Sequence, residues 1–242
     1  MKNTVKRILQ QLLGFNTYLK IFARYKIFTL KSDKNEGDFF AFMSLLKDEG
    51  LILDIGANLG IMTWHLLKKF PNAEIWAFEP IPENSKILHT VTGKIKHNRF
   101  KIFDFALGDN AGTAKMVLPN VSKVKMQGLS HVVHDSIDEF NQGDFYEVQL
   151  ETLDNLIDSN KKVQGIKLDV ENFEYFVLKG AEKLIERDKP IIYTELWDNE
   201  NRDKCLSFIK SKGYSIKFHN GSKLVDFSPE KYSGQNFFFI PN

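Results

Sequence analysis

Cysteine is almost absent from this sequence, and long apolar runs are missing. Cys205 is the single cysteine of 242 residues, so the chain has no internal disulfide and no set of cysteines with zinc-site spacing. No apolar run reaches roughly eighteen residues, and Gln10, Gln11 and Asn16 interrupt the N-terminal stretch where a signal peptide needs a continuous apolar core. We therefore expect a cytoplasmic, folded protein rather than an integral membrane or secreted one.

Acidic residues are also missing from residues 1–31, which hold seven of the 33 Lys and Arg residues. The remainder carries 26 basic and 31 acidic residues, so the two parts have opposite charge. Apolar residues with helical spacing draw one face in the basic segment: Val5, Ile8, Leu9, Leu12 and Leu13. Such a helix could lie on a membrane surface or bind a partner, which would make the protein membrane-peripheral. Alternatively, it packs onto the domain edge with its cations in water.

From residue 37 onward, short apolar runs alternate with amphipathic stretches, as in an α/β protein with a parallel sheet. We assign residues 1–36 to a helical extension and residues 37–242 to one α/β domain. The expected strands are 51–55, 74–79, 100–107, 165–170, 190–196, 214–219 and 236–240. The expected helices are 38–48, 60–69, 82–92, 173–187 and 199–212. Asn220-Gly221 predicts a tight hairpin turn, and 119–145 is expected to be a long loop.

The first motif is an apolar strand that ends in an acid and turns through glycines into a helix, Leu51-Ile-Leu-Asp-Ile-Gly-Ala-Asn-Leu-Gly60. Gly56 and Gly60 lack side chains, so a nucleoside-sized ligand could approach the backbone there, although close helix packing produces the same spacing. The carboxylate of Asp54 would repel a pyrophosphate and attract an ammonium group. The motif therefore favours S-adenosylmethionine over a dinucleotide.

The second motif is another strand that ends in an acid, Glu74-Ile-Trp-Ala-Phe-Glu-Pro80. Glu79 follows Gly60 by about 20 residues, the offset at which an acid accepts hydrogen bonds from ribose hydroxyls. Pro80 ends the strand. The alternative is an exposed acid at a strand end.

Several ordered motifs together resemble the FkbM-type methyltransferases over residues 37–241. They are DIGANLG (54–60), FEP (78–80), ALGD (106–109), ETLDNLI (151–157), IKLDVENFEYFVLKGAE (166–182), PIIYTEL (190–196) and NFFFIP (236–241). The resemblance implies a Rossmann-like class I methyltransferase fold, with a mostly parallel seven-stranded sheet whose last strand is antiparallel. It also implies S-adenosylmethionine as donor and O-methylation of hydroxyls on sugars, glycans or natural products.

The resemblance assigns donor binding to nine residues. The residues expected around the methionine moiety are Asp54, Gly56, Ala57, Asn58 and Gly60. Glu79 and Pro80 would hold the ribose, and Asp104 and Ala106 would lie near adenine. A shift of one residue would send the Asp104 side chain to the other face of its strand.

The chain departs from the family pattern Asp-Val-Glu-Gly at Asn172, where it reads Asp169-Val-Glu-Asn172. Asparagine tolerates positive φ best after glycine, so we expect the fold to survive. The added side chain could narrow the ligand pocket.

Three acids follow neighbouring strands, so we expect Asp169, Glu171 and Glu195 at one crevice as candidate catalytic residues. They could act as a general base or hold Mg²⁺, or they could merely order a loop and cap a helix. No dedicated ligand spacing supports a metal site. His131 and His134 are alternative proton acceptors.

Two rival functions stay open. The spacing of Tyr175 and Lys179 matches the Tyr-x-x-x-Lys of short-chain dehydrogenases, although Asp54 opposes a dinucleotide phosphate. A non-catalytic S-adenosylmethionine-binding protein would keep the same donor motifs. The domain beyond the N-terminal segment is net acidic and has no basic stripe, so we expect no nucleic-acid substrate.

Overall fold

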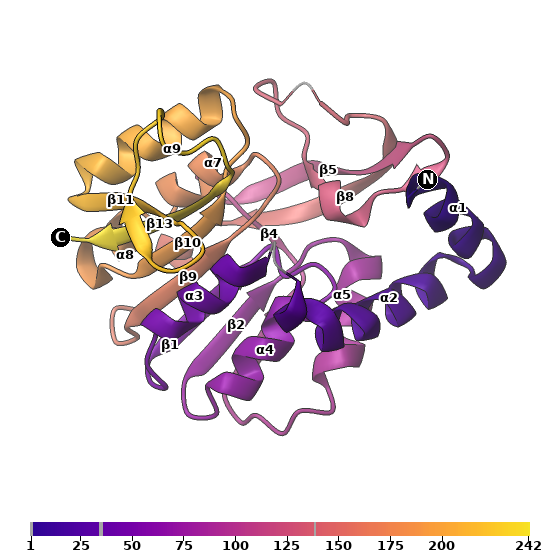
Figure 1. Cartoon of the computed structure of the whole chain (residues 1–242), viewed down its shortest axis with the longest axis horizontal. Coiled ribbons are helices and arrows are strands. Elements are labelled where there is room, and N and C mark those ends of the chain that lie inside the picture. The colour runs from indigo at the N-terminus through magenta and orange to yellow at the C-terminus, as the bar shows by residue number, and fades with distance from the viewer. Residues whose placement is uncertain (1, 34–35, 138) are drawn as a thin grey trace.

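A mostly parallel sheet forms the centre of the molecule (Figure 1). The structure is a computed structural model that describes residues 2–33, 36–137 and 139–242. In the described part of the chain this sheet has eight strands, in the spatial order β12-β11-β13-β10-β9-β1-β2-β3. Their bounds are β1 (Leu51–Ile55), β2 (Glu74–Phe78), β3 (Phe100–Phe103), β9 (Val163–Leu168), β10 (Ile191–Glu195), β11 (Tyr214–His219), β12 (Leu224–Asp226) and β13 (Asn236–Pro241).

The pairing confirms a parallel sheet whose last strand is antiparallel. β1 pairs in parallel with β2 and β9, whereas β13 runs antiparallel to both β10 and β11. The expected count of seven strands was short by one, because the turn at Asn220-Gly221 returns the chain as β12 along β11. The backbone N–H of Asn220 donates to the Lys223 carbonyl and closes this hairpin.

Helices cover both faces of the large sheet, because its central strands are buried on both sides. Ile52 and Ile75 face α3 and α4, while Leu53, Trp76 and Ile166 face the cluster that includes α7, α8 and α9. The helices are α1 (Lys2–Leu13), α2 (Phe15–Thr29), α3 (Gly37–Leu45), α4 (Ile61–Lys69), α5 (Pro82–Thr92), α6 (Leu153–Leu156), α7 (Glu174–Lys179), α8 (Glu182–Asp188) and α9 (Glu200–Ser211). Among the described residues, no helix is both long enough and apolar enough to cross a membrane.

The two N-terminal helices differ in how they meet the domain. The apolar face of α2 packs on α4 and α5, where Leu19, Ala23 and Ile27 contact Leu59 and Ile87. The apolar residues of α1 stay exposed, from Leu9 at 39% to Leu12 at 77%. The apolar face of α2 therefore packs onto the domain edge, whereas that of α1 does not.

A second sheet lies beside the carboxyl ends of the parallel strands (Figure 1). It consists of β4 (Ala106–Leu107), β5 (Gly112–Val121), β6 (Val124–Lys125), β7 (His131–Val132) and β8 (Gly143–Glu151). The expected loop at 119–145 was wrong for half of its described length, because the ends of β5 and β8, the strands β6 and β7 and the 3-10 helix η3 (Gln127–Leu129) occupy it.

Two expected elements are each divided in the structure. The run 100–107 splits into β3 and β4, which belong to different sheets, with Asp104 and Phe105 between them. The run 173–187 splits into α7 and α8 at Gly180, where a Cβ would lie 1.9 Å from the Gly108 carbonyl oxygen. The backbone of Gly180 therefore lies against that of Gly108, at the point where α7 ends and before α8 begins.

Candidate active site

The turn after β1 brings two strand ends into backbone contact. Gly56 has φ +74°, and a Cβ on it would lie 1.8 Å from the carbonyl oxygen of Asp169, which follows the neighbouring strand β9. No side chain fits at Gly56 without moving the Asp169 loop. The glycine of the first motif therefore fixes the distance between two walls of the site.

A cavity with about 560 Å³ of empty space, part of it open to solvent, lies at this edge of the sheet. Seven of the sequence-predicted residues line it: Gly56, Asn58, Glu79, Pro80, Ala106, Asp169 and Glu171. Phe78, Phe105 and Phe173 add aromatic wall, and Gln127 and Gly128 close it from the second sheet. Sequence reasoning missed Gln127 because the surrounding segment has no clear period.

Glu79 is the buried acid of this cavity, with 5% of its surface exposed. Its carboxylate accepts hydrogen bonds from the backbone N–H of Asn58 (2.8 Å) and of Ile81 (2.9 Å), and from the Asn84 side chain (3.3 Å). Burial raises its pKa to about 7, against the lowering effect of these donors. Two of these donors share Oε1 and one reaches Oε2, so Oε2 is the oxygen that retains capacity for a further donor.

Three amide side chains around the cavity each leave an oxygen without a hydrogen-bond partner among the described residues. They are the buried Oδ1 of Asn58, Oδ1 of Asn84 and Oε1 of Gln127. An unpaired buried acceptor costs free energy, so such groups point to a ligand with donors. The cavity therefore suits a molecule rich in hydroxyl or amino groups.

Four residues assigned to donor binding lie outside the lining of this cavity. A Cβ at Gly60 would meet Leu88 of α5 at 2.5 Å, and Ala57 packs with Leu88 in a small core cluster. The Asp104 side chain is 63% exposed and accepts a hydrogen bond from Ser85. Asp54 is fully buried.

Asp54 holds a buried lysine that sequence reasoning missed. The Asp54 carboxylate accepts a hydrogen bond from Thr63 (2.6 Å) and lies 3.4 Å from Nζ of Lys167. Lys167 also donates to the Gly56 carbonyl (2.7 Å) and lies 3.4 Å from Asp169. Burial lowers the pKa of Lys167, but Asp169 and Asp54 outweigh it and raise the pKa overall. The sequence signal that could have identified Lys167 was its position as a charged residue within an otherwise mostly apolar strand.

A second cavity lies on the other side of Asp169. It has about 830 Å³ of empty space, part of it open to solvent, and Asp169 lines both cavities. Tyr193, Glu195 and Tyr232 form much of its wall, together with Glu36. The sequence placed Glu36 in the N-terminal extension, whereas the structure places it at this cavity.

The three predicted carboxylates meet at the border of the two cavities. Burial and the negative charge of Asp169 raise the pKa of Glu195 to about 7. Burial and the charges of Asp169, Glu195 and Glu174 raise the pKa of Glu171 well above its ordinary value. Glu171 lines the first cavity, Glu195 lines the second and Asp169 lines both, so the three acids lie at one edge of the sheet, as the strand order predicted.

The loop that carries Asp169 and Glu171 has a strained backbone. Glu171 has φ +54° and Asn172 has φ +74°, and the Glu174 carboxylate stabilises the loop by accepting from the Val170 N–H (2.9 Å). The expected tolerance of Asn172 for positive φ is confirmed. Its side chain accepts from Asn199 (3.0 Å) and Asn201 (3.2 Å) and lines neither cavity, so it does not narrow either of them.

Neither candidate histidine lines these cavities. His131 is fully buried, and its ring nitrogens bond the Leu129 carbonyl (2.9 Å) and the Asn141 side chain (3.0 Å). His134 bonds Ser136 and packs on Phe176. Both are occupied by structural contacts.

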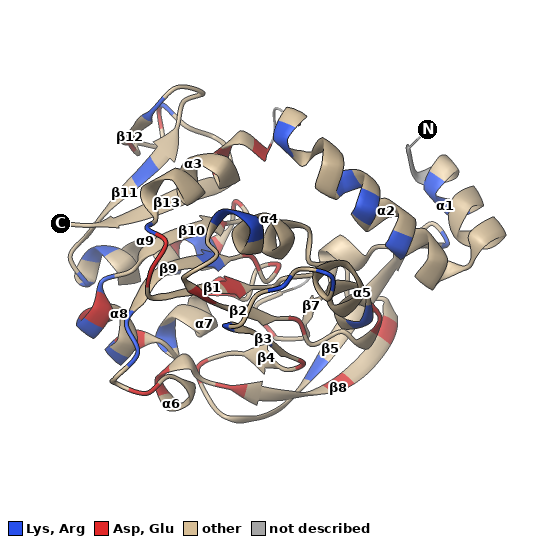
Figure 2. Cartoon of the chain, turned by 90° about the horizontal axis from the view of Figure 1, so that it is seen from below, with Lys and Arg blue, Asp and Glu red and all other residues tan. Residues whose placement is uncertain are grey.

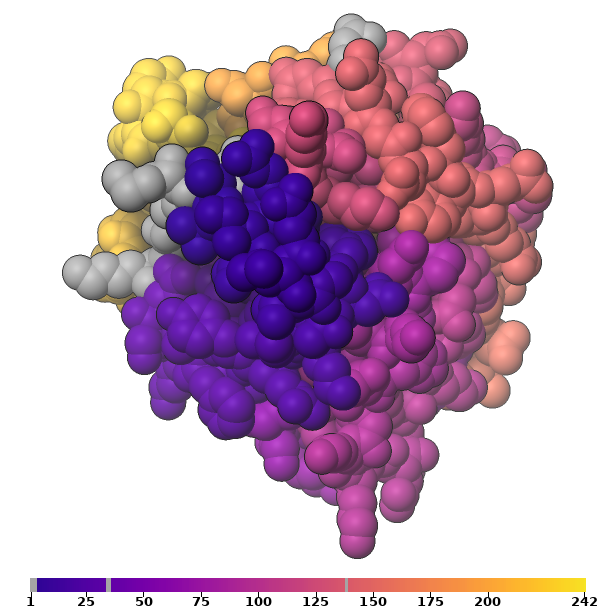
Figure 3. Space-filling model, turned by 90° about the vertical axis from the view of Figure 1, so that its right-hand side faces the viewer, coloured from indigo at the N-terminus to yellow at the C-terminus, as the bar shows by residue number. Residues whose placement is uncertain are grey.

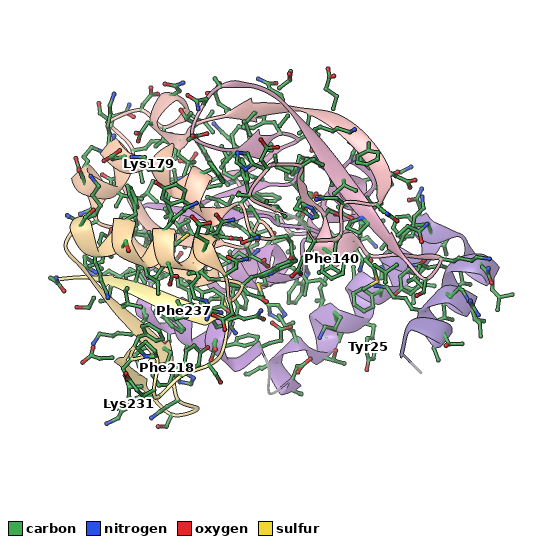
Figure 4. All side chains as sticks on the ribbon, turned by 90° about the horizontal axis from the view of Figure 1, so that it is seen from above. Tyr25, Phe140, Lys179, Phe218, Lys231 and Phe237 are labelled. Carbon is green, nitrogen blue, oxygen red and sulfur yellow. The ribbon has the colours of Figure 1, made fainter. Side chains whose placement is uncertain are left out.

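The candidate dehydrogenase pair lies outside both cavities. Tyr175 packs against Phe208, and Lys179 pairs with Glu182 at 3.0 Å. Figure 4 shows Lys179 on the opposite side of the molecule from α1. In the described part of the chain, no three His, Cys, Asp or Glu side chains are grouped so that they could hold a metal ion.

The sequence of residues 54–216 matches the model of the methyltransferase FkbM domain, which covers most of the chain. The chain belongs to the FkbM methyltransferase family. This membership overturns the dehydrogenase alternative. Two fungal proteins of similar sequence are named "Methyltransferase 1", from Beauveria bassiana, and "Methyltransferase sdnD", from Sordaria araneosa. The first protein is 24% identical, and the match covers 70% of this chain and 74% of the fungal protein. The second is 23% identical, and the match covers 78% of this chain and 81% of the fungal protein.

A solved FkbM methyltransferase, from Methylobacillus flagellatus, has the same fold. It superposes with a TM-score of 0.55 at 18% identity over 99% of this chain. The matched region spans 59% of the bacterial protein's chain, so that protein is substantially longer. The structural similarity to this protein thus extends beyond residues 54–216, which the family model matches.

Proposed function

We propose that this FkbM methyltransferase transfers a methyl group from S-adenosylmethionine to a hydroxyl oxygen of a sugar, glycan or small natural product. The observation that carries the proposal is the position of Asp169, which lines both cavities. A donor in one cavity and an acceptor in the other would meet at this carboxylate. Positioning two reactants in this way removes much of the entropic barrier to their reaction.

The first cavity fits the donor by the chemistry of its walls. Glu79 would accept from the ribose hydroxyls, and the unpaired oxygens of Asn58, Asn84 and Gln127 offer acceptors to amino and hydroxyl groups. Phe105 and Ala106 form an apolar wall suited to adenine. When bound, S-adenosylmethionine supplies a methyl group on a sulfonium, whose S–C bond breaks as the acceptor oxygen bonds to carbon. Asp169 and Glu171 line this cavity and would offer carboxyl oxygens to the amino-acid part of the donor.

The second cavity supports a hydroxylated acceptor. Tyr193 and Tyr232 offer aromatic surface, and Gln235 and Asn236 offer polar groups. Pockets of this mixed character bury an apolar ring face and fix its polar edge.

Asp169 and Glu195 are the pair that we assign to proton removal. The pKa of about 7 for Glu195 suits a general base near neutral pH, since such a group is largely ionised and still binds a proton. Asp54 lines neither cavity and acts as a positioning residue: Thr63 holds Asp54, and Asp54 holds Lys167. Lys167 in turn holds Asp169 and itself lines the second cavity.

The proposed function is tested by transfer of label from S-adenosylmethionine to hydroxylated glycans, small natural products and lipids. Asp169→Asn and Glu195→Gln keep side-chain volume, and we expect each to lower kcat by roughly 100-fold or more because a proton acceptor is lost. Glu147→Gln, at an exposed acid on β8, is the matched control and should retain wild-type kcat. Donor binding without transfer to any acceptor class would favour the non-catalytic alternative.

The pH–rate profile separates proton transfer from metal use. A base formed by Asp169 and Glu195 must be ionised, so kcat should fall as pH drops below about 7. Chelators should leave this profile unchanged. Loss of activity with a chelator, restored by Mg²⁺ or Mn²⁺, would instead assign the carboxylates to an ion.

Donor affinity tests the role of Glu79 independently of the acceptor. We expect calorimetry to detect S-adenosylmethionine, with an affinity that falls below about pH 7, because protonation of Glu79 removes an acceptor. Glu79→Gln should weaken binding by about 1–3 kcal/mol and abolish this pH dependence. Tighter binding of a nicotinamide dinucleotide would contradict the donor assignment.

A further inference from the structure

The exposed apolar side chains of this protein are concentrated on α1 and α2. Eight of the eleven large hydrophobic residues that are exposed in the described part of the chain lie between residues 5 and 28. Leu12 and Phe28 are the most exposed, at 77% and 81%. Single exposed apolar residues need no explanation, but a contiguous group on one surface indicates a binding site.

These side chains form one surface because α1 is held at an angle beside α2. Val5, Leu9 and Leu13 of α1 face Ile21 and Tyr25 of α2 across an apolar hollow. Figure 4 shows Tyr25 on the outer side of α2. Gln10 fixes α1 to β6, since its amide donates to the Lys125 carbonyl (3.0 Å) and accepts from the Lys125 N–H (3.2 Å). The exposed α1–α2 surface is therefore a built part of the fold.

Basic side chains border this α1–α2 surface, and residues 1–31 contain no acid. Figure 2 shows the basic positions spread along α1 and α2. Lys26 pairs with Asp33 at 2.7 Å and Lys6 donates to the sulfur of Met126, whereas the four other described cations form no ion pair with any described residue. These four are Arg7, Lys20, Arg24 and Lys31.

The cationic border continues onto the adjoining helices. Arg24 and Phe28 share a second hollow with Trp64 of α4 and with Lys94, which follows α5. In Figure 3 the indigo residues of α1 and α2 occupy the centre of one face of the molecule, beside magenta residues that follow later in the chain. Apolar side chains and free cations thus occupy the same face.

We propose that the α1–α2 surface binds an anionic lipid membrane from one side. Apolar side chains would enter the boundary between headgroups and acyl chains, while Arg7, Lys20, Arg24 and Lys31 would contact lipid phosphates. Charge complementarity selects this occupant, because the rest of the chain has 26 basic and 31 acidic residues and would be repelled by the same membrane.

The experiment is co-sedimentation of the full chain with vesicles of phosphatidylcholine alone and with vesicles that also contain phosphatidylglycerol. We expect binding to the anionic vesicles only, and we expect about 0.5 M salt to weaken it by screening. The double variant Leu12→Gln/Phe28→Gln should bind about tenfold more weakly or worse. Replacing Arg7, Lys20, Arg24 and Lys31 by Gln should also weaken binding at least about tenfold.

Matched controls change similar residues elsewhere. Leu45→Gln/Phe145→Gln removes two exposed apolar residues from other surfaces and should bind vesicles like the wild type. A charge control with the same expected result replaces four exposed lysines by Gln: Lys162, Lys183, Lys210 and Lys223. Unchanged S-adenosylmethionine binding in all variants would show that the fold is retained, so this test is independent of the proposed acceptor.

Three results would overturn the membrane proposal. One is equal sedimentation with neutral and anionic vesicles, or none with either. Another is wild-type vesicle binding by both α1–α2 variants. The third is a dimer in the absence of lipid that becomes a monomer in Leu12→Gln/Phe28→Gln, because a second copy of the chain would then cover this surface.

Discussion

The glycines at and near the first cavity have different roles: some are required by the backbone geometry, and others only line the cavity. Gly56 and Gly128 both line the first cavity, but only Gly56 has positive φ and a neighbour that excludes a Cβ. Gly60, which looks identical to Gly56 in the motif, instead allows α4 to approach Leu88. Spacing alone did not distinguish these roles, since helix packing and ligand binding place glycines at the same interval.

Alanine substitutions test this distinction. Gly56→Ala should lower the free energy of unfolding by about 2–4 kcal/mol and weaken donor binding, because the new Cβ displaces the Asp169 loop. Gly128→Ala has no atom within 4 Å of its new Cβ, so stability should change by less than about 0.5 kcal/mol. Urea unfolding and calorimetry measure both effects. Equal losses in the two variants would contradict the backbone role of Gly56.

At the scale of elements, the local sequence pattern predicted some helices and strands, whereas others depend on pairing between distant segments. α5 begins and ends at the expected residues because Pro82 starts it and its apolar face has helical spacing. In contrast, β5 and β8 pair across a separation of about thirty residues, and Gln127 reaches the donor cavity only because this second sheet places it there. No property of the isolated segment 119–145 encodes that pairing.

The attachment of α1 gives a prediction at the same scale. Gln10→Ala removes two hydrogen bonds to Lys125, so amide exchange in residues 2–13 should accelerate by about tenfold. Exchange in the buried strand β1 should not change. Gln11→Ala, exposed on the same helix, is the control and should leave exchange at the wild-type rate. If the two variants exchange alike, Gln10 does not hold α1 in place.

For the whole molecule, the buried acids make stability depend on pH. The pKa values of Glu79 and Glu195 are raised to about 7 and that of Glu174 to about 8, each chiefly by burial, from an ordinary value of 4.5. Between pH 4.5 and these raised pKa values, the three carboxyl groups keep their protons in the folded chain but have lost them in the unfolded chain. The stabilising contribution is complete below about pH 4.5 and is lost as pH rises through 7 to 8.

We therefore expect the free energy of unfolding to fall as pH rises from 5 to 8. Glu174→Gln should flatten this dependence, because the amide does not titrate and its oxygen can still accept from the Val170 N–H. Urea unfolding at several pH values measures the slope, and Glu147→Gln should keep the wild-type slope. Stability that rises over this range would contradict the raised pKa values.

The sequence by itself determined the class of fold and much of the candidate donor site. Its strand periodicity, its glycine turn and the acids at strand ends follow from local geometry, so Gly56, Asn58, Glu79 and Asp169 were predicted before any contact was known. Parallel strands bring their carboxyl ends to one edge, which also placed Glu195 near Asp169.

Only the tertiary structure decided which side chains share a cavity. Lys167 joins Asp54 to Asp169 across two paired strands, and Glu36 and Tyr232 reach the second cavity from distant parts of the sequence. Whether α1 is covered also depended on packing, because an apolar helical face looks the same when buried or exposed. Burial, strand pairing and charge proximity are properties of the folded chain, and together they set the pKa values and the cavities on which function depends.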